Sequence, residues 1–229
     1  MRTRLKICCI ADAEELRLAV AAGADAVGLV GPMPSGPGSI PLERAAELAR
    51  LCPPGVTSVL LSSARTAEAL ALEVEKVQPL ALQIVDRLGV EVRRALRRGF
   101  PWLRLLQVVH VEGPQALEEA RASAEAADAL LLDSGRPTAD PPELGGTGRP
   151  HDRRLARTIV EAVRLPVFLA GGLRPETVGA AIRAVRPFGV DVCSGVRRDG
   201  RLDADRLAAF ARAVAAGPGT GAVPVTAVG

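Results

Sequence analysis

Short apolar runs and amphipathic segments alternate along the whole chain. Each apolar run is rich in Val, Leu, Ile or Ala and stops at small or polar residues, which is typical of parallel strands buried on both faces. The strand-like runs are 5–9, 26–30, 57–61, 81–85, 104–109, 129–132, 167–170 and 190–193. The segments with helical periodicity are 13–22, 42–51, 64–76, 90–98, 113–126, 153–164, 175–185 and 204–215.

This regular alternation, with no break in composition, predicts one α/β domain: a closed (β/α)8 TIM barrel over residues 1–216. The length of 229 residues is close to that of a single barrel. Helix signals agree, because Pro175 suits a first helical turn and Asp203 suits an N-cap. Residues 217–229 have no periodicity and are predicted to form a flexible C-terminal tail.

Composition narrows the classes of partner. Aromatic residues make up only 2% of the chain and the net charge is +3 with both signs interspersed, so no nucleic acid is expected as a partner. No apolar stretch reaches the roughly 18 residues that a membrane span requires, so no membrane is expected either. Met1 leads directly into a strand rather than a signal sequence, and a cytoplasmic location is therefore predicted.

The four cysteines are Cys8, Cys9, Cys52 and Cys193. They lack metal-ligand spacing, so no metal is expected, and without a secretion signal they are predicted to be reduced thiols. Because side chains alternate along a strand, Cys8 and Cys9 are predicted to point to opposite faces, with only one inside the barrel.

Small residues follow two consecutive strands, as Gly171-Gly172 and as Ser194-Gly195. At such an exit, meaning the segment that directly follows a strand, small residues let backbone N–H groups approach an anion. The positive N-terminal end of a following helix further stabilises the anion. Their order matches the phosphate site that barrels form after strands seven and eight. Ordinary turn glycines remain the alternative interpretation.

Two reactive side chains also end predicted strands. Cys8 ends the first strand, with Lys6 one layer deeper on the same face, where its charge would favour a thiolate. Asp133 ends the sixth strand, at the C-terminal face where barrels hold their active sites. The pair is a candidate base and acid. A buried apolar role for Cys8 and a turn-capping role for Asp133 remain open.

Two connections at that face, 31–40 and 134–152, are longer than a compact strand-to-helix loop requires. Long loops at this face often cover a site, and plain surface insertions are the alternative.

Several segments resemble a known family in the order in which they occur. The run Lys6-Ile7-Cys8-Cys9-Ile10 is similar to a Lys-Ile-Cys-Gly-Ile opening, and further matches follow at 23–28, 131–134, 145–148, 169–173 and 185–196. On these motifs, which extend from Lys6 to about Phe210, the chain resembles the phosphoribosylanthranilate isomerases of tryptophan biosynthesis.

This resemblance implies an Amadori rearrangement of an N-(5-phosphoribosyl) amine to a 1-deoxyribulose 5-phosphate amine. Asp133 would be the general acid that protonates the furanose oxygen, and Cys8 would be the thiolate that removes the C2′ proton. No cofactor is expected, because the imine nitrogen serves as the electron sink. The expected partner is a phosphorylated small molecule, and the protein is expected to be a monomer or homodimer. The implied phosphate-binding residues are Gly146, Thr147, Gly171, Gly172, Ser194 and Gly195.

Three positions depart from the family pattern. The loop after the second strand has Gly36-Pro37-Gly38 where the family has Ser-Pro-Arg, whose arginine pairs with the anthranilate carboxylate. The fourth strand has Val85 in place of a histidine, and Cys9 replaces a glycine. If anthranilate is still bound, Gly38→Arg is predicted to improve affinity about tenfold.

The candidate pocket residues are Lys6, Gln83 and Arg136. Arg136 and Arg87 could supply a cation near the barrel mouth, although surface charges fit both. Two further functions remain open: an isomerase for a different phosphoribosyl amine, and a non-catalytic phosphosugar-binding barrel. Retention of both Cys8 and Asp133 argues against the second, because binding alone needs neither.

Overall fold

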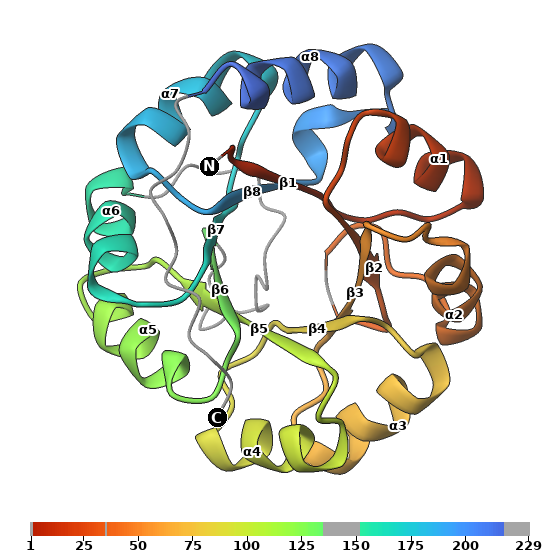
Figure 1. The fold of residues 1–229 in the computed structure, drawn as a ribbon, viewed down its shortest axis with the longest axis vertical. Helices are drawn as coiled ribbons and strands as arrows, with labels where there is room; N and C mark the ends of the chain where they lie inside the picture. Colours follow the sequence, from red (N-terminus) through yellow and green to blue (C-terminus); the bar gives the residue numbers. More distant parts are fainter. Residues whose placement is uncertain (1, 35, 135–151, 218–229) are drawn as a thin grey trace.

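The structure is a computed structural model that describes residues 2–34, 36–134 and 152–217. Its parallel strands form a closed barrel in sequence order, with the first strand paired to the eighth, and a ring of helices surrounds them (Figure 1). The strands are β1 (Arg4–Ile7), β2 (Ala26–Val30), β3 (Thr57–Ser62), β4 (Ala81–Ile84), β5 (Arg104–His110), β6 (Ala129–Asp133), β7 (Val167–Leu169) and β8 (Gly189–Val192). The helices are α1 (Ala13–Ala21), α2 (Leu42–Leu51), α3 (Ala67–Val77), α4 (Val90–Gly99), α5 (Ala116–Ala124), α6 (Arg153–Ala162), α7 (Pro175–Val185) and α8 (Ala204–Ala215). The predicted TIM barrel is confirmed.

Alternation along the strands builds two apolar cores. In β8, Val190 and Val192 pack in the layer between the strands and the helices, while Asp191 between them faces the barrel interior. A separate cluster fills the interior, with Val59, Leu106 and Leu131 among its members.

The ends of the elements coincide with the predicted ends or differ from them by at most three residues. Helix α3 begins later than predicted because the Thr66 side chain caps it, accepting a hydrogen bond from the Ala69 N–H at 3.2 Å. The expected caps of α7 and α8 are confirmed: Pro175 is the first residue of α7, and the Asp203 side chain accepts from the Arg206 N–H at 2.9 Å.

A short segment between β8 and α8 was not predicted. It contains the 3-10 turn η1 (Ser194–Val196) and a two-stranded hairpin, β9 (Arg197–Arg198) and β10 (Arg201–Leu202). Of the predicted tail, only Gly217 lies within the described residues. None of the described helices is long and apolar enough to cross a membrane.

Candidate active site

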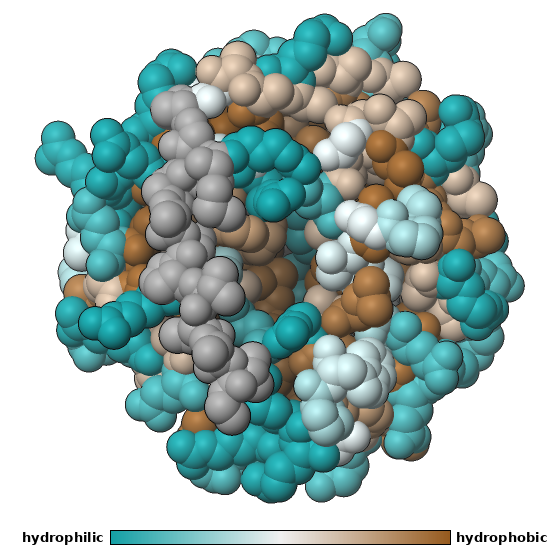
Figure 2. All heavy atoms as spheres, viewed as in Figure 1, coloured by the Kyte–Doolittle hydropathy of each residue, from teal (hydrophilic) through white to brown (hydrophobic). Residues whose placement is uncertain are grey.

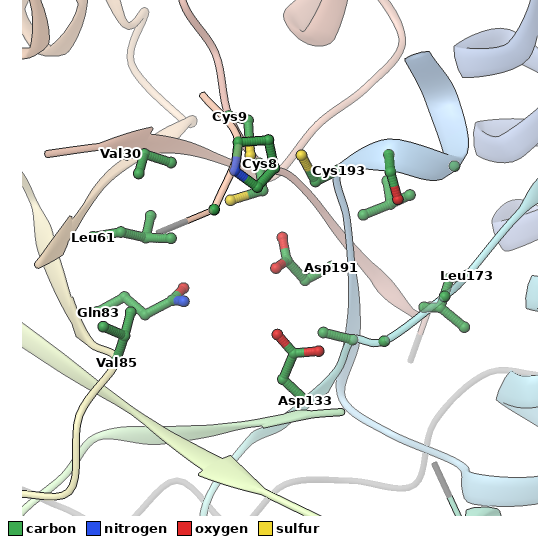
Figure 3. A pocket seen from close by; sticks show the side chains of 18 of the residues that line it. Cys8, Cys9, Val30, Leu61, Gln83, Val85, Asp133, Leu173, Asp191 and Cys193 are labelled. Carbon is green, nitrogen blue, oxygen red and sulfur yellow. The ribbon is translucent and has the colours of Figure 1, made fainter. Parts of the chain in front are cut away.

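A pocket opens at the C-terminal ends of the strands. Seen down the barrel, hydrophobic residues lie at the bottom of a central hollow surrounded by hydrophilic ones (Figure 2). The close view shows side chains from several strands converging on this space (Figure 3). The pocket therefore lies at the face where the reactive strand ends were expected.

The candidate base and acid face the same space. Cys8, next after β1, and Asp133, the last residue of β6, both line the pocket and lie on opposite sides of it (Figure 3). The Asp133 carboxylate also accepts a hydrogen bond from the Ser134 N–H at 2.7 Å. This local bond fixes the carboxylate, so the turn-capping interpretation and a chemical role are compatible.

The prediction that Cys8 and Cys9 point to opposite faces is wrong. Both side chains line the pocket, and each residue is only 5% exposed. The reason is that Cys9 has φ +65°, a left-handed conformation that ends the extended strand and turns its side chain back toward the barrel axis. Strand alternation does not extend past Cys8.

A third thiol, Cys193, joins this side of the pocket from the end of β8 (Figure 3). Hydrogen bonding between the thiols of Cys9 and Cys193 raises the pKa of Cys9 and lowers the pKa of Cys193. The positive charge of Arg197 also contributes to the lowered pKa of Cys193. Three thiols therefore line this side of the pocket, and the surroundings of Cys193 lower its pKa.

Lys6 lies below the pocket, and its Nζ is 3.0 Å from Oδ1 of Asp191. It lines a different cavity, at the N-terminal ends of the strands, whereas Asp191 lines the pocket that contains Cys8. Burial alone would lower the pKa of Lys6, but the Asp191 carboxylate and nearby Cys8 raise it overall. Lys6 therefore remains charged and holds Asp191 at the pocket floor. Asp191 was not singled out from the sequence, although it lies only three residues before the predicted Ser194-Gly195 segment.

A second buried ion pair supports the cysteines from outside the barrel. Arg197 pairs with Glu15 at 2.7 Å, and its Nη2 also donates to the backbone carbonyls of Cys9 at 2.5 Å and Cys8 at 3.4 Å. Burial alone would raise the pKa of Glu15, but hydrogen bonds from Arg197 and from two backbone N–H groups lower it overall. The unpredicted hairpin that carries Arg197 therefore anchors the end of β1.

The expected phosphate-binding glycines lie on the rim of the pocket. Gly171 and Gly172 have φ of +83° and +63°, a conformation that favours glycine. Gly195, on the neighbouring exit, lies so close to the Leu173 carbonyl that a Cβ there would overlap it. Ser194 also lines the pocket. Gly146 and Thr147 lie outside the described residues.

The wall formed by β2, β3 and β4 is mainly apolar. Val30, Leu61 and Val85 line it, together with the amide of Gln83 (Figure 3). Gln83 is 4% exposed, and its Oε1 has no hydrogen-bond partner among the described residues. An unpaired buried oxygen facing a pocket is suited to accept a hydrogen bond from a ligand.

Of the two arginines considered near the mouth of the barrel, the structure describes only Arg87. Arg87 pairs with Glu119 at 2.8 Å and does not line the pocket, so its interpretation as a surface charge is confirmed. Arg136 lies outside the described residues. Among the described lining residues there is no Lys, Arg or His, and no metal-binding group of three or more His, Cys, Asp or Glu occurs in the described part of the chain.

The predicted benefit of Gly38→Arg is also wrong for the single substitution. Gly38 has φ +79°, and a Cβ at this position would lie 2.5 Å from the Cβ of Cys9. Such an approach is far inside van der Waals contact. The sequence carried no sign of this contact, because it depends on the unexpected direction of the Cys9 side chain.

Comparison with known proteins identifies one family. Residues 5–213 match the family model described as N-(5'-phosphoribosyl)anthranilate (PRA) isomerase. The N-(5'-phosphoribosyl)anthranilate isomerase of Methanocella arvoryzae is 36% identical over 205 residues, covering 90% of this chain and 94% of that protein.

Solved structures agree with the family model. The phosphoribosyl anthranilate isomerase of Thermotoga maritima is 31% identical, with a TM-score of 0.80 over 93% of this chain and 98% of that one. Another solved phosphoribosyl anthranilate isomerase, 30% identical with a TM-score of 0.77, covers 93% of this chain and 98% of its own. That structure is a complex with reduced 1-(o-carboxyphenylamino)-1-deoxyribulose 5-phosphate.

Proposed function

The chain belongs to the N-(5'-phosphoribosyl)anthranilate isomerase family, and from this premise we propose that its pocket isomerises N-(5'-phosphoribosyl)anthranilate. The product is 1-(o-carboxyphenylamino)-1-deoxyribulose 5-phosphate, whose reduced form is bound in a related structure. The reaction is an aldose–ketose isomerisation, an Amadori rearrangement. The observation that carries the assignment is that a thiol and a carboxylate face one another across a pocket rimmed by glycine exits.

Asp133 acts as the general acid. Its proton goes to the furanose ring oxygen, the bond from that oxygen to C1′ breaks, and the aniline nitrogen supplies the electron pair for a protonated C1′=N imine. The position of Asp133 at the end of β6, held by the Ser134 N–H, suits this step. Asp191, fixed by Lys6 on the pocket floor, keeps a second negative charge close to the iminium.

Cys8, as a thiolate, removes the proton from C2′. The released electron pair moves to C1′ and the C1′=N bond pair returns to nitrogen, which gives an enolamine. Protonation of C1′ and loss of the C2′ hydroxyl proton then yield the ketone. Because the imine nitrogen accepts the electrons, this route requires no cofactor. Gln83 accepts a hydrogen bond from a substrate hydroxyl or amine group.

The substrate phosphate binds at the glycine exits. Within the described residues, the backbone N–H groups of Gly171 and Gly172 have no hydrogen-bond partner. Helix α7 begins three residues after Gly172, at Pro175, and its N-terminal end favours a negative charge. Gly195 and Ser194 complete this anion site from the β8 side, and Gly146 and Thr147 are proposed to join them.

The phosphorylated substrate is therefore the partner, and the protein is a cytoplasmic enzyme of tryptophan biosynthesis that is a monomer or homodimer. The test is complementation of a tryptophan auxotroph that lacks this isomerase, together with turnover of N-(5'-phosphoribosyl)anthranilate by the purified protein. Growth and turnover that both disappear in Asp133→Asn support the assignment. Phosphosugar binding without turnover would instead indicate a non-catalytic barrel.

A further inference from the structure

The turn that contains Gly38 lies directly against Cys9. A Cβ at position 38 would be 2.5 Å from the Cβ of Cys9 and 3.2 Å from its Sγ. Carbon atoms that are not bonded to one another prefer separations of about 3.5–4.0 Å. While Cys9 keeps a side chain, position 38 therefore accommodates only glycine.

Neither partner is free to move away. The Cys9 carbonyl accepts a hydrogen bond from Arg197, which is itself paired with buried Glu15. On the other side, the Ile40 N–H donates to the Val30 carbonyl at 2.9 Å, and the Ser39 hydroxyl donates to the Gly31 carbonyl at 3.0 Å. The contact between Cys9 and Gly38 is thus held from both sides.

The pair lies at the side of the pocket that the aryl group would occupy. If the phosphate binds after β7 and β8 as proposed, the aglycone would extend across the barrel toward the opposite wall, formed by β2, β3 and β4. Gly36, Pro37 and Met33 line that part of the pocket together with Cys9 (Figure 3 labels Cys9). The described lining residues include no Lys, Arg or His, so a carboxylate on the aglycone meets no positive charge among them.

We propose that Cys9 and Gly38 form a specificity-determining pair, which keeps this wall uncharged and lets the enzyme accept N-(5-phosphoribosyl) arylamines whose aryl group carries no carboxylate. The inference rests on the proposed isomerase function and specifies its substrate class. Cys9 excludes any side chain from position 38, so a cation can be introduced there only when the Cys9 side chain is removed.

The test compares kcat/KM for N-(5-phosphoribosyl)anthranilate and N-(5-phosphoribosyl)aniline, each normalised to its uncatalysed rearrangement rate. For the native enzyme, the normalised preference for anthranilate is expected to stay below about tenfold, since one charge-assisted contact is worth about tenfold or more. A preference of 100-fold or more would overturn the proposal, because another group would then recognise the carboxylate.

Two double variants test the contact itself. Cys9→Gly with Gly38→Arg is expected to raise the preference for anthranilate by about tenfold or more. Cys9→Ser with Gly38→Arg is the matched control: serine keeps the Cβ, so this variant is expected to gain no preference and to melt at a lower temperature. Equal gains in both variants would overturn the proposal. If either variant fails to fold, the preference of the native enzyme between the two substrates still decides whether the proposal holds. Turnover of neither substrate by the native protein would refute the isomerase function itself.

Discussion

Lys6 and Asp191 form a buried ion pair between the first and last strands of the barrel, with Nζ 3.0 Å from Oδ1. The two residues are direct neighbours in the β1–β8 register, and their side chains are 1% and 9% exposed. The pair links the two strands whose pairing closes the barrel, and it also fixes a carboxylate at the pocket floor. Its energetic and chemical roles are therefore linked.

Lys6→Met should destabilise the protein by about 3–5 kcal/mol, because it leaves the Asp191 carboxylate buried without its cation. Urea denaturation at neutral pH measures the loss. Lys76→Met is the matched control, since Lys76 pairs with Glu43 on the surface and both side chains are exposed. The control is expected to change stability far less. Equal losses of stability in the two variants would show that the buried pair stabilises the protein no more than the surface pair does.

Cys8→Ser and Asp133→Asn should each lower kcat by at least about 10²-fold while leaving the binding of a phosphorylated substrate analogue nearly unchanged. Each removes a proton-transfer group but no phosphate contact. Cys52→Ser is the control, because Cys52 does not line the pocket and burial raises the pKa of its thiol to about 11. The activity of the Cys52→Ser enzyme should equal that of the native enzyme. An active Cys8→Ser enzyme would assign the base to another group, with Cys193, whose pKa is lowered, the first to test.

The barrel and most of the pocket could be predicted from the sequence. Eight apolar runs separated by helical segments leave few other folds, and residues at strand ends must gather at the C-terminal face. That rule predicted that Cys8, Asp133 and the glycine-rich segments after β7 and β8 would lie around one pocket. Each of these inferences uses only the local pattern and the order of the elements.

What could not be predicted depends on contacts between distant residues. Arg197 reaches Glu15 across 182 positions of sequence, and the hairpin that carries it has no strong strand pattern. The left-handed backbone at Cys9 is unusual for a residue other than glycine, so alternation placed its side chain on the wrong face. The close contact with Gly38 follows from that same conformation.

Lowering the pH should reduce the stability of the folded protein, because Glu15 becomes protonated. Its pKa is lowered in the folded state, so its contribution to stability is fully present above its ordinary value of 4.5 and is lost as the pH falls through the folded value. Glu15→Gln should therefore be less stable than the native protein at pH 7 by about 1–3 kcal/mol. The difference should begin to shrink below pH 4.5, where the unfolded carboxyl takes up a proton, and should level off below the lowered pKa of the folded state, where the native carboxyl is neutral as well. Denaturation curves from pH 7 to pH 3 measure it, and a difference that stays constant would contradict this role.

Gly172→Val should raise the KM for a phosphorylated substrate by about tenfold or more, since loss of one hydrogen bond to a charged group costs about 1.5–3 kcal/mol. Valine disfavours the φ of +63° at this position, so the backbone N–H groups beside it would turn away from the anion. Gly55→Val is the matched control: Gly55 also has a positive φ, of +91°, but it lines the cavity at the opposite end of the barrel. Both variants should lose similar stability, so a rise in KM confined to Gly172→Val separates anion binding from backbone strain. Inorganic phosphate should also inhibit the native enzyme and the Gly55→Val variant more strongly than it inhibits Gly172→Val. If phosphate inhibits all three equally, the anion binds away from the β7 exit, and the proposed orientation of the substrate in the pocket is wrong.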